Sequence, residues 1–378
     1  MESTLRRTWA EIDLDALAHN YQTLRRRTGA RFVGVVKADA YGHGSVQVSR
    51  VLEELGADYL AVSSLDEAME LRAGGITMPI LILGHTPPER VEELLRYHIT
   101  QAVTCEAKAL EYSAEAVRCG GTLKIHIKVD TGMSRLGFLC GGDHFETGVA
   151  GICAACTLPG LEAEGIFTHF AVSDEADAES DAYTRGQFDL FCRMIDAVAR
   201  RGGVTFASRH CANTGATTLF PDTHLDMVRP GLLLYGYGEH ARILGLKPVM
   251  AVKTTISTIK TYEPDTCVSY GRRFRTQRRT RMAVLGIGYA DGLFRTLSGK
   301  CSFAVAGHKA PQCGSICMDM CMIDVTDIPD AAVGSQVEIF GPDNDITALS
   351  DAAGTIPYEL LCAVSKRVPR VYPPQKRR

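Results

Sequence analysis

The sequence predicts an α/β barrel of the (β/α)8 type followed by a second, mostly β domain. The first observation is that eight short apolar runs alternate with amphipathic helical segments up to about residue 236. Such alternation indicates parallel βαβ units, and eight units close a barrel. The second observation is that this rhythm stops after residue 246, where apolar runs follow one another with Gly- and Asp-rich turns between them. Runs without intervening helices are typical of a β domain.

The eight apolar runs are the predicted barrel strands. They lie at 32–36, 59–62, 79–83, 99–103, 123–129, 161–168, 205–209 and 225–235. Helical periodicity is clearest in the segments between them. These are 45–55, 65–72, 88–97 and 183–200.

The second domain has predicted strands of its own. They lie at 249–260, 281–287, 301–306 and 336–340. We therefore expect a barrel domain over residues 1–240 and a mostly β domain over 241–378. A further strand-like stretch, 8–14, precedes the barrel, and residues 1–14 are candidates to pair with the β domain.

Composition narrows the class of protein. The 378 residues are 46% hydrophobic and 22% charged with a net charge of −3, which is ordinary for a globular chain and gives no basic field for nucleic acid or anionic membranes. The N-terminus lacks the apolar core of a signal peptide, and no run is long enough to span a bilayer. The 13 cysteines suit a reducing compartment. We expect a cytoplasmic protein with no bound metal, its cysteines acting as small apolar residues.

Polar side chains gather where the predicted barrel strands end. Lys37 follows the first strand, the segment 128–135 ends the fifth, His169 follows the sixth, 209–214 ends the seventh, and Arg229 lies on the eighth. The active site of such a barrel lies at the carboxyl ends of its strands. These residues are therefore expected to converge on one small volume.

The residues in that volume suit imine chemistry beside a phosphate. A lysine with positive neighbours such as Arg135 and Arg229 can be neutral enough to attack an aldehyde. Backbone N–H groups after the seventh and eighth strands, near Thr214 and Gly231, can hold a phosphate. Tyr41 can donate its hydroxyl to the same anion. The pattern fits pyridoxal phosphate (PLP), or a phosphorylated sugar in a Schiff-base aldolase.

Seven segments resemble the alanine racemase family, in the family's order. They are 36–44, 128–133, 168–171, 228–231, 268–271, 288–292 and 316–319. The resemblance covers nearly the whole chain. It implies the fold-type III barrel of PLP enzymes, PLP as cofactor, and a homodimer in which the β domain of one subunit completes the partner's active site.

The resemblance also implies the catalytic residues. Lys37 would hold PLP and act as one base, and Tyr270 from the partner subunit would act as the other on the opposite face. Two bases are needed because racemisation removes a proton from one face and returns it to the other. His169 would hydrogen-bond Tyr270, and Arg229 would face the pyridine nitrogen with His210 supporting it.

Binding roles follow by the same resemblance. Arg135 and the backbone N–H of Met318 would bind the substrate carboxylate, Tyr289 would line the entrance, and Lys128 matches a lysine that is carbamylated in some members. Two positions depart from the common pattern: Thr214 replaces serine, and Ser134 replaces glycine. The implied cofactor-binding set is Lys37, Tyr41, Arg135, His169, Asn213, Thr214, Arg229, Gly231, Leu232 and Tyr358.

The function implied is PLP-dependent interconversion of L- and D-alanine, which supplies D-alanine for peptidoglycan. Three alternatives stay open. A racemase of serine or another small amino acid is disfavoured by the bulk of Tyr358, a PLP decarboxylase is disfavoured by Arg229, and a non-catalytic PLP carrier is disfavoured by the second domain that carries Tyr270.

Overall fold

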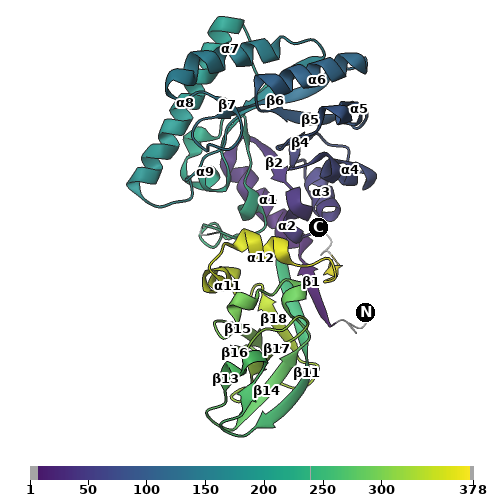
Figure 1. The fold of residues 1–378 in the computed structure, drawn as a ribbon, viewed down its shortest axis with the longest axis vertical. Helices are drawn as coiled ribbons and strands as arrows, with labels where there is room; N and C mark the ends of the chain where they lie inside the picture. The colour runs from purple at the N-terminus through teal and green to yellow at the C-terminus, as the bar shows by residue number, and fades with distance from the viewer. Residues whose placement is uncertain (1–6, 239, 375–378) are drawn as a thin grey trace. The chain divides into compact units, whose positions relative to one another are not determined.

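The computed structural model describes residues 7–238 and 240–374; residues 1–6 of the predicted N-terminal segment lie outside it. The chain divides into two compact units (Figure 1). The barrel unit comprises Tyr21–Ala40 and Ser45–Leu234. The β unit comprises the chain up to Asn20, the short segment Tyr41–Gly44, and the chain from Tyr235 onward.

The barrel unit contains the predicted eight-stranded parallel barrel, nearly closed. In sequence order its strands are β2 (Arg31–Val35), β3 (Tyr59–Val62), β4 (Ile80–Ile82), β5 (Ile99–Val103), β6 (Leu123–Asp130), β8 (Leu161–Phe167), β9 (Ser208–His210) and β10 (Met227–Val228). Each pairs in parallel with the next from β2 to β9, and β10 pairs with β2. A backbone hydrogen bond from Asp226 N to Arg209 O bridges the remaining seam at 3.0 Å. The short strand β7 (Phe138–Leu139) adds to β6 outside this ring.

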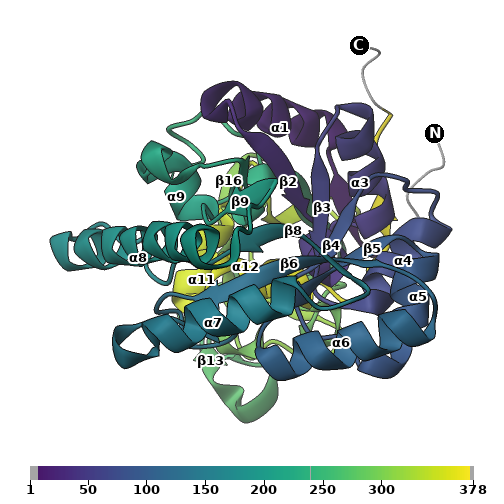
Figure 2. The same ribbon diagram turned by 90° about the horizontal axis from the view of Figure 1, so that it is seen from above.

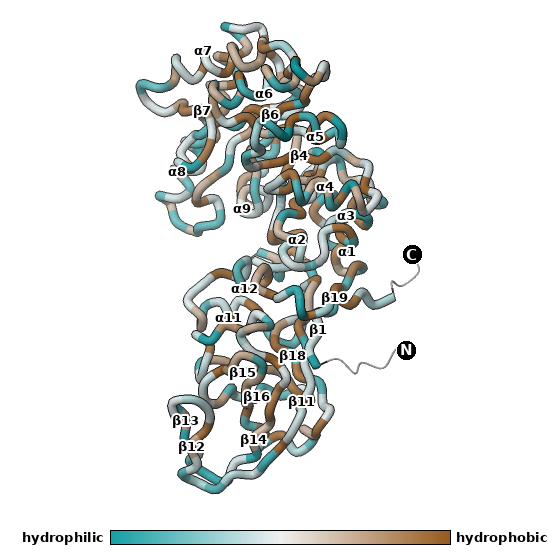
Figure 3. The backbone as a smooth tube through the Cα atoms, turned by 45° about the vertical axis from the view of Figure 1, so that its right-hand side comes forward, coloured by the Kyte–Doolittle hydropathy of each residue, from teal (hydrophilic) through white to brown (hydrophobic). Residues whose placement is uncertain are grey.

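Helices cover the outside of the barrel, as Figure 2 shows for α3 to α8. Their polar ends are capped locally: Asp177 accepts the N–H groups of Glu179 and Ser180 at the start of α8, and Gly203 ends it with φ +61°. Hydrophobic residues concentrate along the strands, whereas the helices alternate in hydropathy (Figure 3). The helices that lie wholly in this unit are α3 (Ser45–Glu54), α4 (Leu65–Ala73), α5 (Val91–Arg96), α6 (Glu106–Arg118), α7 (Phe145–Cys156), α8 (Ala178–Gly202), α9 (Thr214–Leu219) and α10 (Gly231–Leu234). Two more, α1 (Leu14–Thr28) and α2 (Lys37–Gly42), pass from one unit to the other.

The last predicted strand is shorter than expected. Only Met227–Val228 is β-structure, and the apolar run 231–234 forms the helix α10 instead. Pro230, which has no N–H to give to a ladder, separates the two. The hydrophobic pattern of a short, fully buried apolar run does not distinguish a strand from a helix, which explains why the strand was predicted too long.

The β unit is built on one mixed sheet. Its order is β14-β17-β16-β15-β18-β11-β1-β19, and β14 also pairs with β11. The strand β1 runs antiparallel to β11, with Thr8 opposite Thr254. A short hairpin, β12 (Cys267–Val268) with β13 (Phe274–Arg275), extends from it. The sheet strands are β1 (Thr8–Ile12), β11 (Met250–Tyr262), β14 (Thr280–Leu285), β15 (Ser302–Val305), β16 (His308–Cys313), β17 (Cys321–Asp324), β18 (Gln336–Phe340) and β19 (Arg370–Val371).

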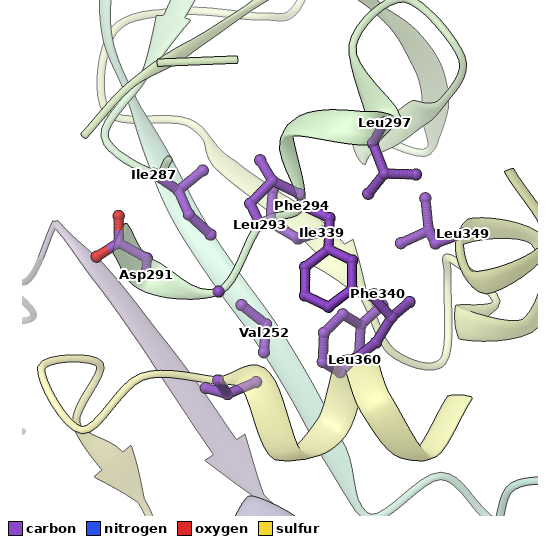
Figure 4. Close-up of a pocket in the computed structure, with 12 residues that line it drawn as sticks. Val252, Ile287, Asp291, Leu293, Phe294, Leu297, Ile339, Phe340, Leu349 and Leu360 are labelled. Atoms are coloured by element: carbon purple, nitrogen blue, oxygen red, sulfur yellow. The ribbon is translucent and has the colours of Figure 1, made fainter. Parts of the chain in front are cut away.

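Two helices, α11 (Ile346–Ala353) and α12 (Pro357–Ala363), close the apolar core of the β unit. Figure 4 shows a small apolar pocket in this core, where Ile339 and Phe340 of β18 meet Leu349 and Leu360 of the helices. The carboxylate of Asp291 borders the pocket and points away from it. Packing of this kind fixes the loops that extend from the sheet.

Candidate active site

The segment after β2 holds Lys37 at the start of an unusual turn. Residues 38–41 have φ between +52° and +54°, so α2 is wound in the left-handed sense. This conformation costs L-residues roughly 1–2 kcal/mol each. Local hydrogen bonds hold it: Ala40 N donates to Val36 O at 2.9 Å, and Ala38 N donates to Glu67 Oε1 at 2.7 Å. Strain maintained in this way is typical of functional sites, and here it follows directly after Lys37.

Five predicted site residues come together at the carboxyl ends of the barrel strands. Burial lowers the pKa of His169 well below its usual value, and the positive charges of Arg229, Lys128, Arg135 and Lys37 lower it further. We call these five residues the mouth cluster. Four basic side chains around one neutral imidazole make a site suited to a ligand that carries several negative charges.

Arg229 is buried and donates to four acceptors. Its N–H groups reach Thr168 O at 2.8 Å and Cys211 O at 3.2 Å, and they face the Nδ1 atoms of His210 at 2.6 Å and His169 at 3.4 Å. A guanidinium can only donate, so both Nδ1 atoms must accept and both rings must carry their proton on Nε2. Burial lowers the pKa of Arg229 to about 10, so it remains charged at neutral pH.

Lys128 is buried beside Arg229. Burial, and then the charge of Arg229, lower the pKa of Lys128 to about 7. Its amine lies 5.0 Å from the centre of the Phe167 ring and donates a long 3.4 Å hydrogen bond to Val129 O. A substantial fraction of this amine is therefore neutral near pH 7.

Asp130 shapes the turn that leads to Arg135. Its carboxylate accepts the backbone N–H groups of Gly132 and Ser134 at 3.0 Å and of Arg135 at 3.1 Å. Ser134 has φ +55°. Ser134, which by the family resemblance stands where glycine is common, thus adopts a glycine-like conformation, and the Asp130 hydrogen bonds support it.

The loops after β9 and β10 meet through Thr214. Asn213 caps α9 by accepting Ala216 N at 3.1 Å, and Thr214 Oγ1 accepts Leu232 N at 3.1 Å. This bond joins the starts of α9 and α10, so Gly231 and Leu232 lie beside Thr214 as the sequence predicted. Backbone N–H groups at two helix starts form a small donor-rich corner.

Two predicted phosphate ligands lie in the β unit. Tyr41 is buried, and its ring centre is 5.7 Å from that of Tyr358 and 5.0 Å from that of Tyr235. Burial, then the neighbouring Tyr358, raise the pKa of the Tyr41 phenol. Its hydroxyl is therefore a donor over the whole working range of pH.

Tyr270 is presented by a tight loop of the β unit. The residues around it, Ser269, Gly271 and Arg272, all have positive φ, and Ser315 Oγ donates to Tyr270 O at 2.9 Å. The Tyr270 side chain is 71% exposed. The fixed backbone and open side chain leave the phenol accessible to another molecule.

Tyr289 and Met318 belong to the two motifs that follow Tyr270 along the chain, and both side chains are exposed. Ala290 N donates to Met318 O at 3.0 Å, which joins the two segments. Asp291, which sequence reasoning did not single out, is buried behind them and pairs with Arg7 and Arg367, each at 2.8 Å. Asp291 lies inside the motif 288–292, so the resemblance at that motif could have indicated it.

Sequence reasoning also passed over His126. It lies on β6 two residues before Lys128, and side chains two apart on a strand share a face, so the position of Lys128 could have predicted an interior His126. Its Nδ1 lies 2.9 Å from His210 Nε2. Within residues 7–238 and 240–374, no group of three or more His, Cys, Asp or Glu is placed to bind a metal, and no helix is long and apolar enough to cross a membrane.

Comparison with known proteins identifies the family to which this architecture belongs. The family model for the alanine racemase N-terminal domain matches residues 12–239, and that for the alanine racemase C-terminal domain matches residues 249–372. The chain belongs to the alanine racemase family. An alanine racemase of Desulfovibrio desulfuricans is 44% identical over 98% of this chain and 100% of its own length. Alanine racemase 1 of Clostridium acetobutylicum is also 44% identical, over 97% of this chain and 96% of its own.

Solved alanine racemases share the fold. The enzyme of Clostridium difficile superposes with a TM-score of 0.91 at 38% identity, covering 97% of this chain and 96% of that one. The alanine racemase of Bacillus anthracis, solved with bound L-Ala-P, superposes with a TM-score of 0.84 at 33% identity, covering 97% and 95%. The predicted family, barrel fold and amino-acid isomerase class are thus confirmed for this alanine racemase family member.

Proposed function

We propose that the chain interconverts L- and D-alanine with PLP bound covalently to Lys37. The observation that carries the proposal is the mouth cluster, which gathers four basic side chains around His169. PLP and an amino-acid substrate bring a phosphate, a phenolate oxygen and a carboxylate, and such a cationic site suits these anions. The donor set at the barrel mouth therefore fits this cofactor.

When bound, PLP supplies the electron sink that makes the substrate Cα–H acidic. The remaining work falls to the chain itself. Lys37 Nζ would take or return the Cα proton on one face, and the phenol oxygen of Tyr270 from the partner subunit would do so on the other. Two groups on opposite faces are the minimum for inversion at carbon.

The tautomer of His169 supports a base role for Tyr270. Because Arg229 donates to His169 Nδ1, His169 keeps its proton on Nε2. That N–H can donate to a phenolate and stabilise it. A tyrosine with an ordinary pKa near 10 is a poor base near neutral pH, so such stabilisation is what the reaction requires.

The other residues would bind and orient. Arg135 and the Met318 backbone N–H would hold the carboxylate, with Tyr289 at the entrance. A carbamate on Lys128 would add a negative charge beside Arg135. The phosphate would be held by Tyr41, Asn213, Thr214, Gly231, Leu232 and Tyr358.

We infer that the active unit is a homodimer with shared sites. Large apolar side chains of the β unit that would serve the partner, Tyr270 and Met318, are 71% and 54% exposed in the single chain. We also infer a cytoplasmic location, since a reducing compartment is where a chain of this size with 13 cysteines would keep them as thiols.

Circular dichroism of L-alanine incubated with the PLP-supplied protein tests the function. We expect the optical signal to decay to zero as the racemate forms. A protein that binds PLP and leaves the signal unchanged would refute the proposal. A kcat/KM for L-serine tenfold or more above that for L-alanine would move the assignment to a serine racemase.

Borohydride reduction tests the attachment site. The PLP-supplied protein should show a visible absorbance that borohydride abolishes while fixing the cofactor to the chain. Lys37→Ala should lose this fixation, and Lys300→Ala, an exposed lysine of the β unit, should keep it. Fixation that persists in Lys37→Ala would place the imine on another lysine.

A further inference from the structure

A line of polar side chains runs from the mouth cluster through the barrel interior, with two hydrogen bonds and one longer contact between its members. Arg229 faces His210 Nδ1 at 2.6 Å, His210 Nε2 lies 2.9 Å from His126 Nδ1, and His126 Nε2 lies 3.6 Å from the carboxylate of Glu164. Both histidines are fully buried. We call these four residues the relay. Its strands β6, β8 and β9 are neighbours in the sheet.

Arg229 at one end of the relay and the Glu164 carboxylate at the other favour the same proton positions on the two histidines. Arg229 only donates, so His210 must accept on Nδ1 and carry its proton on Nε2. His210 then donates to His126 Nδ1, which leaves the His126 proton on Nε2, aimed at a carboxylate that only accepts. Both rings are neutral in this arrangement, and burial lowers the pKa of each.

The barrel is built to accommodate this relay. A Cβ on Gly165 would lie 2.6 Å from the His126 ring, so only glycine fits at that position of β8. The register of β6 and β8 shifts between Ile125 and His126, and Glu164 is the extra residue inserted there. Bulges of this kind re-aim a side chain and are rare between parallel strands.

Glu164 has further partners that fix its carboxylate. The Tyr59 hydroxyl donates to Glu164 Oε2 at 2.9 Å and lies 2.7 Å from Thr100 Oγ1. Lys124 lies 3.6 Å from Glu164 Oε1. The close approach of His126, 3.6 Å away, is the largest cause that lowers the pKa of Glu164, to about 2, so the relay ends on an anion at neutral pH.

Arg229 needs such a remote anion. In the part of the chain that the structure describes, no carboxylate lies within 4.0 Å of its guanidinium. A buried charge without compensation is unfavourable, and two polarised neutral imidazoles can connect it to Glu164.

We propose that His126 and Glu164 are positioning residues that fix the tautomer of His210 and thereby keep Arg229 oriented as a donor toward the pyridine nitrogen of the cofactor. This rests on the proposed function. If His210 instead carried its proton on Nδ1, that N–H would face an N–H of Arg229, and the guanidinium would have to turn away. The pyridine nitrogen could then take a proton, which strengthens the ring as an electron sink. The relay therefore favours racemisation over the side reaction in which alanine and PLP give pyruvate and pyridoxamine phosphate.

The first test needs no cofactor. Nitrogen NMR of the 15N-histidine-labelled apoprotein reports which ring nitrogen carries the proton. We expect His210 and His126 in the Nε2–H form, with assignments from His210→Gln and His126→Gln. A His210 signal of the Nδ1–H form in the unmutated apoprotein would overturn the relay, whatever the enzyme catalyses.

The second test compares two glutamates of β8. Glu164→Gln removes the relay anion with little change of shape, and Glu162→Gln removes a 55% exposed carboxylate that also faces Lys124 but lies outside the relay. In Glu164→Gln we expect pyruvate formed per racemisation turnover to rise about tenfold, the size of a charged hydrogen bond partly lost, and the His210 signal to shift toward a tautomer mixture. Glu162→Gln should match the unmutated protein in both.

Equal pyruvate ratios and equal His210 signals in the two variants would reject the positioning role. Absence of racemisation in the unmutated holoenzyme would instead reject the proposed function. The proton positions in the relay would then be decided by the NMR spectrum of the apoprotein alone. If Glu164→Gln fails to fold, Tyr59→Phe, which removes one donor to Glu164, should move both readouts in the same direction by a smaller amount.

Discussion

Individual side chains at the barrel mouth owe their chemistry to burial among like charges. Lys128 is the clearest case, since its pKa falls to about 7 through burial and then through Arg229. Only a neutral amine attacks carbon dioxide, so this lysine is prepared for carbamylation at neutral pH. The place of Lys128 at the end of a barrel strand could be predicted from the sequence, whereas its lowered pKa depends on neighbours that only the fold brings together.

Carbamylation of Lys128 can be measured directly. In 13C-bicarbonate buffer at pH 8 we expect one carbamate signal in the carbon NMR spectrum of the unmutated protein. Lys128→Met should abolish it, and Lys124→Met, an exposed position four residues earlier on β6, should leave it. A spectrum without the signal would mean that Lys128 acts as a plain amine.

Glu164 predicts an acid-dependent stability. Its folded pKa of about 2 lies below the ordinary 4.5, so its stabilising effect is complete above pH 4.5 and is lost as the pH falls toward 2. Glu164→Gln should therefore lower the free energy of unfolding by roughly 1–3 kcal/mol at pH 7, and the deficit should shrink below pH 4.

Urea denaturation across this pH range measures the effect. Glu162→Gln, at an exposed neighbour, should change the free energy of unfolding by less than about 0.5 kcal/mol at any pH. A deficit in Glu164→Gln that stays constant from pH 7 to pH 3 would contradict the assignment of the shifted pKa to Glu164.

The sequence predicted the barrel strands, but it did not predict two local features of the backbone. Apolar rhythm located all eight barrel strands because burial on both faces leaves continuous apolar runs. The left-handed turn at residues 38–41 was not predictable, since its residues carry no glycine before Gly42 to indicate positive φ. The bulge at Glu164 was equally hidden, because a one-residue shift of register leaves the hydrophobic pattern almost unchanged.

Two glycines on neighbouring elements make a matched test of packing around the relay. Gly165→Ala would push a methyl group to 2.6 Å from the His126 ring, so we expect it to destabilise the protein by roughly 1–3 kcal/mol. Gly186→Ala, in the exposed middle of α8 with nothing within 4 Å, should stabilise it by about 0.5–1 kcal/mol.

Thermal or urea unfolding of the two variants gives the comparison. Opposite signs would support a barrel interior filled by His126. A neutral Gly165→Ala would mean that the ring moves aside at little cost, and it would weaken the case for a fixed relay.

For the complete chain, the order of the motifs predicted more about function than the alternation of apolar and helical segments did. Eight βα units predict a barrel and place polar residues at its strand ends. Only the seven segments that resemble the alanine racemase family indicated the roles of those residues and that Tyr270 belongs to the site. The charge pairs of Asp291 with Arg7 and Arg367 join distant parts of the chain, and no local pattern predicts such contacts.

A shared active site makes a quantitative prediction about mixed dimers. Lys37 lies in the barrel unit and Tyr270 in the β unit. If each site takes Lys37 from one subunit and Tyr270 from the other, a dimer of one Lys37→Ala and one Tyr270→Phe chain has one intact site and one doubly defective site. Random mixing makes half of the dimers mixed, so about a quarter of the unmutated activity should return.

The assay should follow the direction of racemisation that Tyr270→Phe alone abolishes, so that neither parent contributes. Native mass spectrometry can confirm the fraction of mixed dimers. Since a site contained within one chain would be defective in every subunit of the mixture, activity that stays at the parental level despite abundant mixed dimers would place both bases in the same chain. A return near one quarter would instead require that the two bases act across the subunit boundary.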